Sequence, residues 1–286
     1  MKTTTLANAT IPVIGFGGMP LSIQGRPREE QGKKVLHAAI DAGMTLIDTA
    51  DVYCLDDDDI GHNERLIASV VSERADRDRI HVATKAGLRR PRGAWVNDGR
   101  PERIREACEQ SLRSLRSERI WLYQFHAPDP KVPFETSVET FAELQRAGRF
   151  EHFGLSNVSV DQIDRASKIL PVVSVQNRLN PYFRESIGVA QECARRGIVF
   201  LAYSPVGGGR LAKKLPKFEV LQRIAEKHSA SVHGVTIAWV RAQGETVVPI
   251  PAARTIEHAV DSAHAADIAL GADDLNAIDE TEFDRT

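Results

Sequence analysis

Eight short apolar runs alternate with segments of helical period along the whole chain, and this alternation restricts the fold more than any other feature. The runs are apolar almost without interruption, which is typical of parallel strands covered by helices on both faces. We therefore predict an α/β fold whose strands lie at Val13–Phe16, Thr45–Ile47, Ile80–Thr84, Ile120–Phe125, Phe153–Leu155, Val172–Val175, Ile198–Ala202 and Val247–Ile250.

The segments between these runs carry apolar residues at the spacing of amphipathic helices. One helix ends at Gly43 and another begins at Pro101, residue types that are favoured at those two positions. Ser159 and Gln162 have the spacing of a capping box, which begins a further helix. The remaining helices are expected at Phe134–Leu144, Glu219–Lys227, Val232–Gln243, Thr255–Ala266 and Asp273–Glu280.

Two folds accommodate eight strand–helix units, a closed barrel and an open doubly wound sheet. The open sheet carries Gly-x-Gly-x-x-Gly after its first strand when it binds a dinucleotide. Here Gly15-Phe16-Gly17 is followed by Gly18-Met19-Pro20, with proline at the place of the third glycine. We therefore predict a (β/α)₈ TIM barrel that forms a single domain over residues 1–286, with a hairpin over Thr3–Pro12 closing its bottom.

The composition excludes several classes of protein. Lys and Arg number 37 against 39 Asp and Glu, so the formal net charge of −2 gives no general attraction to nucleic acid or anionic lipid. No apolar run approaches the roughly 18 residues of a membrane span, and the first eight residues lack the apolar core of a signal peptide. We expect a soluble, cytoplasmic protein that binds neither nucleic acid nor membrane.

No metal site is expected from the sequence. Cys54, Cys108 and Cys193 lie far apart, so neither a disulfide framework nor a Cys-x-x-Cys ligand pair is present. His62 and Glu64 have a short spacing that occurs at metal sites, but no cysteine or second histidine completes the set. We interpret both residues as structural.

Polar side chains follow three consecutive strands of the predicted barrel, at the end where barrel enzymes place their active sites. Asp48 and Tyr53 follow the second strand, Lys85 ends the third and His126 ends the fourth. An Asp–Lys ion pair would satisfy both charges, and a cation beside Tyr53 is expected to lower its pKa from near 10. This set suits protonation of an oxygen that becomes negative, as in hydride addition to a carbonyl group.

Each of these residues has a simpler interpretation when it is taken alone. Asp48 and Lys85 have the alternative role of a structural ion pair at the barrel rim, and His126 that of a core histidine. The glycines after the seventh strand form a flexible turn in the simpler view, and Cys54 is a packing residue. The catalytic interpretation depends on all four strand-end residues occurring together.

At these positions the sequence resembles the aldo-keto reductase superfamily, over nearly the whole chain. The resemblance implies a barrel without a separate dinucleotide domain, NADPH-dependent reduction of aldehydes or ketones, and a monomer. It assigns Tyr53 as general acid, Lys85 and Asp48 as the residues that tune it, and His126 as the residue that orients the carbonyl. It is carried by Gly15-Phe16-Gly17, Asp48-Thr49-Ala50-x-x-Tyr53, Gly61-His62-Asn63-Glu64, Ala83-Thr84-Lys85, Tyr123-Gln124-Phe125-His126, Gly154-Leu155-Ser156-Asn157, Gln176-Asn177-Arg178 and Ala202-Tyr203-Ser204-Pro205.

The resemblance also assigns cofactor-binding positions. Ser156, Asn157 and Gln176 would hold the nicotinamide carboxamide, and Tyr203 would stack on the ring. Many members place Lys-Ser after the proline of the eighth strand, whereas Ala252-Ala253-Arg254 resembles a subgroup with Gly-Ala-Arg, so Arg254 is the candidate for the 2′-phosphate of NADPH. Because the cations are fewer than usual, NADH stays an alternative cofactor. The other expected contacts are Ser204, Gly207, Gly209, Arg210 and His258.

We therefore expect NAD(P)H-dependent reduction of a small aldehyde or ketone to the alcohol. The alternatives are an NAD-dependent sugar or polyol dehydrogenase working in the reverse direction and a non-catalytic cofactor-binding protein like the subunits of potassium channels. Trp95 is expected to form a wall of the substrate pocket. The six residues after Glu280 are too few to cover the barrel mouth, so we expect an open site for small polar substrates.

Overall fold

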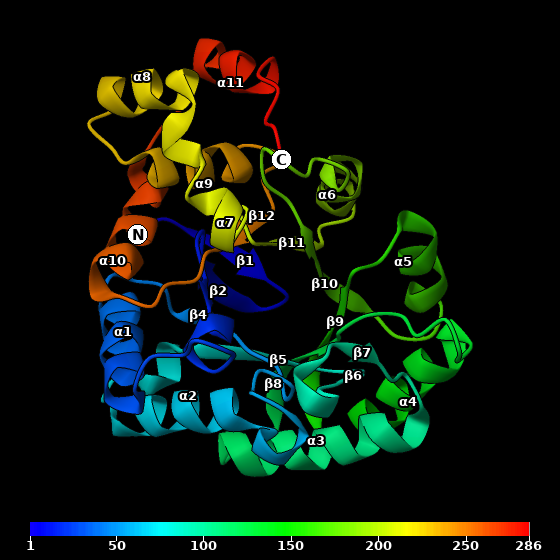
Figure 1. Ribbon diagram of the computed structural model, residues 1–286. Coiled ribbons are helices and arrows are strands. Elements are labelled where there is room, and N and C mark those ends of the chain that lie inside the picture. The colour runs from blue at the N-terminus through cyan, green and yellow to red at the C-terminus, as the bar shows by residue number, and fades with distance from the viewer. Residues whose placement is uncertain (286) are drawn as a thin grey trace.

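Eight parallel strands form a single sheet in the computed structural model, which describes residues 1–285 (Figure 1). Each strand pairs with the next in chain order, so the predicted (β/α)₈ barrel is confirmed. The barrel strands are β3 (Phe16–Gly17), β4 (Leu46–Asp48), β5 (His81–Ala86), β8 (Ile120–Phe125), β9 (Phe150–Ser156), β10 (Val172–Arg178), β11 (Val199–Tyr203) and β12 (Val247–Ile250).

Two glycines allow the first strand to approach the last. The backbone N–H of Gly15 donates to Pro249 O at 3.0 Å and that of Gly17 donates to Pro251 O at 2.8 Å, which closes the barrel. A Cβ atom on Gly17 would lie 2.9 Å from the carbonyl oxygen of Ile250. The Gly-x-Gly pattern that resembles a dinucleotide fingerprint therefore serves close strand packing here.

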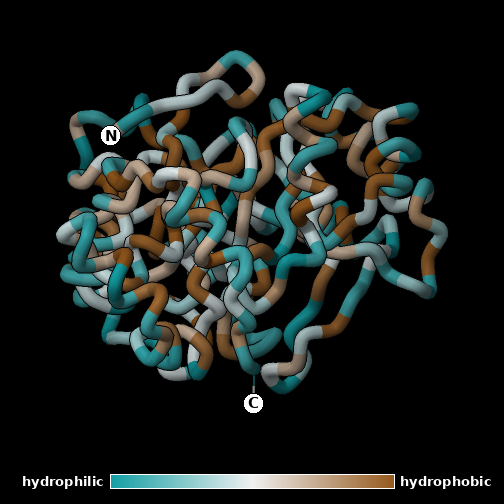
Figure 2. Tube along the Cα trace, turned by 90° about the horizontal axis from the view of Figure 1, so that it is seen from above, coloured by the Kyte–Doolittle hydropathy of each residue, from teal (hydrophilic) through white to brown (hydrophobic). Residues whose placement is uncertain are grey.

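The helices lie outside the strands and cover the barrel (Figure 1). They are α1 (Glu29–Asp41), α2 (His62–Glu73), α3 (Pro101–Leu115), α4 (Phe134–Arg146), α5 (Val160–Ser167), α6 (Ile187–Arg195), α7 (Gly209–Ala212), α8 (Glu219–Lys227), α9 (Val232–Arg241), α10 (Ile256–His264) and α11 (Ala272–Asp279). Seen from above, hydrophilic and hydrophobic residues alternate along the outer helices, as amphipathic helices require (Figure 2). Short 3₁₀ helices occupy Met19–Leu21, Asp57–Asp59, Arg77–Arg79, Pro91–Gly93, Leu215–Lys217 and Ala265–Asp267.

The hairpin before the barrel is confirmed. Strands β1 (Thr3–Leu6) and β2 (Ala9–Pro12) pair in antiparallel register. Leu6 and Ile11 are buried and pack with side chains inside the barrel, including Leu122 of β8. The hairpin thus fills the bottom of the barrel with apolar side chains, and its exposed Asn8 lies 3.2 Å from His152 Nε2.

Local expectations from the sequence are mostly confirmed. The capping box of Ser159 and Gln162 is present at the start of α5, and α8 has its predicted bounds. The first strand is an exception, because Val13 and Ile14 are buried but form a bend, and only Phe16–Gly17 pairs as a strand. The N–H of Val13 donates instead to Lys2 O beside the hairpin, at 3.1 Å.

Within the described residues, every helix is either too short or too polar to cross a membrane.

Candidate active site

The ammonium group of Lys85 joins the strand ends of the predicted catalytic residues. Its Nζ atom donates to Asp48 Oδ2 at 2.6 Å, to Thr49 O at 2.8 Å and to Tyr53 Oη at 3.0 Å. Lys85 is fully buried and Asp48 is 2% exposed. A buried pair is tolerated only when each charge is neutralised and hydrogen-bonded, and both conditions are met here.

The hydrogen bond between Lys85 and Tyr53 determines what the phenol can do. An ammonium group only donates, so the phenol oxygen accepts this bond and its own proton stays available to another acceptor. Tyr53 is 7% exposed and ends in the mouth of the barrel beside His126 and Trp95. The geometry is that of a general acid whose developing phenolate is stabilised by a cation.

The expectation that the cation lowers the pKa of Tyr53 is wrong for this structure. Burial raises the pKa of Tyr53 well above 10.0, and the negative charge of Asp48 raises it further. Burial also lowers the pKa of Lys85, against the opposing effect of Asp48. Tyr53 is therefore neutral and protonated at neutral pH, which is the form that a proton donor requires.

His126 lies beside the phenol of Tyr53 in an edge-to-face arrangement, with the two ring centroids 5.8 Å apart. Burial, with a smaller effect of Lys85, lowers the pKa of His126 well below 6.5, so the imidazole is neutral. Its buried Nδ1 has no hydrogen-bond partner among residues 1–285. A neutral imidazole beside the phenol is suited to orienting a polar oxygen without competing for the proton of Tyr53.

Two glutamines hold the second oxygen of Asp48. Gln124 is not among the site residues that the sequence predicts, and Gln176 is expected from the sequence to hold the nicotinamide carboxamide. Gln124 of β8 donates to Asp48 Oδ1 at 3.2 Å, and Gln176 of β10 donates to the same atom at 2.7 Å. Both side chains lie inside the barrel. The spacing could have indicated this role, because Gln124 lies two residues before His126 and side chains two apart in a strand share one face.

Trp95 is brought next to Tyr53, as expected for a pocket wall. Their ring centroids are 6.2 Å apart in an edge-to-face arrangement, and Trp95 is 47% exposed. The guanidinium of Arg90 lies over the Trp95 ring at 3.8 Å. Trp95 follows the short strand β6 (Leu88–Arg89) and precedes its partner β7 (Val96–Asn97), so this small hairpin carries it to the barrel mouth.

The expected nicotinamide contacts gather at the ends of β9, β10 and β11. Ser156 Oγ donates to the Gln176 carbonyl at 2.8 Å. Tyr203 Oη donates to Asn157 Oδ1 at 2.9 Å, and Asn157 Nδ2 donates to His126 O at 3.0 Å. Asn157 has a left-handed backbone with a φ of 58°, which turns its side chain across the strand ends. Amide, hydroxyl and aromatic groups thus lie together beside His126.

The sequence profile described as the Aldo/keto reductase family matches residues 13–282. The chain belongs to this family. A probable aldo-keto reductase from Glycine max is 32% identical, with 93% of this chain and 84% of the relative covered. The family assignment makes the chain an oxidoreductase and confirms the resemblance to aldo-keto reductases.

Two solved structures share the fold of this aldo-keto reductase over nearly all of the chain. A glycerol dehydrogenase from Gluconobacter oxydans has a TM-score of 0.84 at 27% identity, with 99% of this chain and 98% of that chain covered. An aldo-keto reductase from Klebsiella pneumoniae, solved in complex with NADPH, has a TM-score of 0.79 at 26% identity, with 98% and 95% covered.

The loop after β11 of this aldo-keto reductase contains Gly207, Gly209 and Arg210, which the resemblance predicts to contact the cofactor. Gly207, Gly208 and Gly209 all have positive φ, and Gly207 N donates to Ser204 O at 2.8 Å. Arg210 follows them in α7 and donates to the carbonyl of Arg285 at 2.7 Å. Because no atom lies within 4 Å of a Cβ built on Gly209, the backbone is accessible at this point.

The C-terminal residues of this aldo-keto reductase pack beside that loop. Phe283 is 7% exposed, and its ring lies 4.5 Å from Phe218 and 5.6 Å from Tyr182. Tyr182 Oη in turn donates to Leu211 O in α7 at 3.0 Å. Phe283 is therefore an apolar anchor that fixes the tail to the loop after β10 and to the start of α8.

Arg254 lies between the loops that follow β3 and β12. Its guanidinium donates to Pro20 O at 3.2 Å and to Gln24 O at 3.1 Å. His258 lies in the first turn of α10, where its N–H donates to the capping Thr255 at 3.3 Å. Arg254 and His258 are thus brought to one helix N-terminus, which is a favourable place for an anion. Their contact with a 2′-phosphate stays a prediction.

His62 and Glu64 bind separate partners. His62 Nδ1 lies 2.8 Å from Ser22 Oγ, and Glu64 accepts a hydrogen bond from Thr84 Oγ1 at 2.6 Å. Within residues 1–285, no group of three or more His, Cys, Asp or Glu side chains is placed to hold a metal ion. Both residues have structural contacts in this structure.

Proposed function

We propose that this aldo-keto reductase reduces small aldehydes or ketones to alcohols with NADPH. The observation that carries the proposal is the hydrogen-bonded row Asp48–Lys85–Tyr53 at the barrel mouth, with Lys85 Nζ 2.6 Å and 3.0 Å from its two partners. This arrangement leaves the phenol proton of Tyr53 for the oxygen of a bound carbonyl group.

The side chains present fit a nicotinamide cofactor. Ser156, Asn157 and Tyr203 offer a hydroxyl, an amide and an aromatic ring beside His126. The open backbone at Gly209 and the cations Arg210 and Arg254 suit phosphate groups. When bound, the cofactor supplies the hydride. The Klebsiella pneumoniae relative that binds NADPH supports the choice of cofactor.

The residues of the chain perform the other parts of the reaction. Neutral His126 orients the carbonyl oxygen toward Tyr53. Tyr53 donates its proton as negative charge develops on that oxygen, and Lys85 stabilises the phenolate that results. Asp48, held by Gln124 and Gln176, keeps the ammonium of Lys85 in place. Trp95 forms one wall of the pocket.

Oxidation of a polyol is a second candidate, because the same row of residues operates in reverse and the Gluconobacter oxydans relative is a glycerol dehydrogenase. A direct test uses the purified protein with NADPH, NADH and their oxidised forms against aldehydes, ketones, sugars and polyols, and it follows the absorbance of the reduced nicotinamide. Consumption of NADPH with small aldehydes is expected. Cofactor binding without turnover in either direction would instead indicate a non-catalytic protein.

A further inference from the structure

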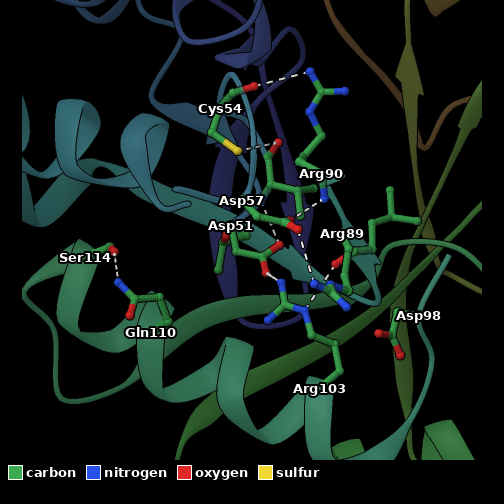
Figure 3. Close-up of polar contacts among 12 residues, drawn as sticks. Asp51, Cys54, Asp57, Arg89, Arg90, Asp98, Arg103, Gln110 and Ser114 are labelled. Carbon is green, nitrogen blue, oxygen red and sulfur yellow. Dashed lines mark hydrogen bonds and ion pairs between the residues drawn. The ribbon is translucent and has the colours of Figure 1, made fainter. Parts of the chain in front are cut away.

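An arginine of helix α3 contacts the turn that carries Tyr53. Arg103 forms an ion pair with Asp51, whose side chain has no exposed surface, while the Arg103 side chain is 12% exposed (Figure 3). Asp51 lies two residues before Tyr53 in the turn after β4. Neither residue belongs to the row that the proposed function uses.

Asp51 holds the turn that carries Tyr53 through hydrogen bonds of both its side chain and its backbone. Its second carboxylate oxygen accepts a hydrogen bond from Val52 N at 2.8 Å. Its backbone carbonyl accepts from Gly61 N at 2.8 Å, and its N–H donates to Lys85 O at 3.4 Å. The position of Tyr53 relative to Lys85 therefore depends on where the side chain of Asp51 is held.

Arg103 also holds the hairpin that carries Trp95. Its Nε donates to the carbonyl of Leu88 at 3.3 Å, and Leu88 pairs with Asn97 across the β6–β7 hairpin. A guanidinium presents donors in a planar fork, so one side chain fixes two acceptors in a defined relative geometry. Arg103 thus links the turn of Tyr53 to the hairpin of Trp95.

We propose that Arg103 and Asp51 form a positioning pair that sets the distance between Tyr53 and Trp95 across the substrate site. This inference rests on the proposed function, since it assumes that Tyr53 is the proton donor. A buried ion pair is often no more stabilising than an apolar pair of the same volume. Fixed geometry is a benefit that an apolar pair cannot supply, and misplacement by about 1 Å can cost roughly 100-fold in rate.

The surroundings of Asp51 give the pair a dependence on pH. Burial raises the pKa of Asp51 to about 6, against the opposing effect of Arg103 from α3. Lys85 faces it from β5, and the carboxyl group of Glu64 and the phenol of Tyr123 lie near it from α2 and β8. Protonation of Asp51 removes the ion pair as the pH falls through about 6.

The test compares Arg103→Met and Asp51→Asn with Arg105→Met, which removes an exposed arginine of the same helix that pairs with Glu143 at 2.6 Å. Both variants of the pair are expected to lose about 10-fold or more in kcat, while the Kd of NADPH measured by protein fluorescence stays within about two-fold. Arg105→Met should behave as the wild type. Should Arg103→Met not fold, Arg103→Lys replaces it, because lysine keeps the charge but not the fork.

The pH profile separates positioning from a general loss of structure. In the wild type, kcat should fall as the pH drops below about 6, and Asp51→Asn should lack this acid limb. Wild-type kcat in both variants, or an unchanged acid limb in Asp51→Asn, would overturn the inference. If Tyr53→Phe also retains full turnover, the proposed function fails as well; if Tyr53→Phe is inactive, only the positioning pair fails.

Discussion

Lys85 uses all three of its hydrogen-bond donors, although it is fully buried. One donor neutralises Asp48, one fixes the carbonyl of Thr49 and one meets the phenol of Tyr53. This saturation explains how a charged side chain is kept in the barrel interior. We therefore expect Lys85 to contribute to both the proposed chemistry and the stability of the fold.

Replacement of Lys85 by methionine should lose activity and stability together. The variant leaves Asp48 with its two glutamine donors but with no cation, and an uncompensated buried charge costs about 3–5 kcal/mol. We expect urea unfolding to show a loss in this range and turnover to fall roughly 100-fold or more. An unchanged free energy of unfolding would contradict the proposed dependence of Asp48 on Lys85.

Arg254 is expected to distinguish the two cofactors. If its guanidinium binds the 2′-phosphate, Arg254→Ala should weaken NADPH binding by about 1.5–3 kcal/mol and leave NADH nearly unchanged. Titration of protein fluorescence with each cofactor measures both affinities. Arg119→Ala, which changes an exposed arginine at the start of β8, is the control. Equal weakening of both cofactors would place Arg254 on the pyrophosphate instead.

The individual site residues were predictable to different degrees. That Asp48, Tyr53, Lys85 and His126 lie together could be predicted because successive strands of a barrel end at one rim, while their roles stay a prediction. The direction in which the pKa of Tyr53 shifts could not be predicted. The sequence shows the neighbouring cation, which is expected to lower this pKa, but not the burial that raises it. Arg103 was also missed, since an arginine in a helix looks like an exposed side chain until its partner is known.

At the level of elements, α2 and β5 enclose an acid that the chemistry does not use. Glu64 is fully buried, and its carboxylate accepts a hydrogen bond from the hydroxyl of Thr84, the residue that precedes Lys85. Burial, with a further effect of Asp51, raises the pKa of Glu64 from 4.5 to about 7. The folded state therefore binds this proton more tightly than the unfolded chain does.

This shift predicts how stability depends on pH. Because folding raises the pKa of Glu64, the contribution of Glu64 to the free energy of unfolding is fully present below pH 4.5. This contribution is lost as the pH rises through about 7. Glu64→Gln does not titrate, so its free energy of unfolding relative to the wild type should rise by on the order of 2–3 kcal/mol between about pH 5 and pH 8. Urea unfolding across this range measures the difference. If the free energies of unfolding of the two proteins changed in parallel with pH, the raised pKa of Glu64 would be refuted.

The elements themselves were largely predictable, because apolar runs and helical stripes mark parallel strands and amphipathic helices. The first strand was not predicted correctly, because Val13 and Ile14 are buried in the apolar cluster that includes α1 but do not pair as a strand. Phe283 is an apolar residue of the short tail, but only the tertiary structure shows that it packs on Tyr182 and Phe218.

For the whole molecule, closure of the barrel depends on the approach of β3 to β12. Gly17→Ala would place a Cβ atom 2.9 Å from Ile250 O, a backbone atom that cannot move without disturbing β12. We expect a loss of about 1–3 kcal/mol in thermal or urea unfolding. Gly188→Ala in α6, where nothing lies within 4 Å, is the matched control and should be neutral or stabilising. Equal stability of both variants would show that the closure is not tightly packed.

The central claim is that Tyr53 donates the proton, and Tyr53→Phe tests it most directly. Tyr123→Phe is the matched control, because this buried hydroxyl has no hydrogen-bond partner among residues 1–285. The measurement is the single-turnover rate of carbonyl reduction with saturating NADPH, together with the Kd of NADPH. We predict a rate at least roughly 100-fold lower for Tyr53→Phe, an unchanged Kd and a wild-type rate for Tyr123→Phe. A Tyr53→Phe rate within about two-fold of the wild type would contradict the account.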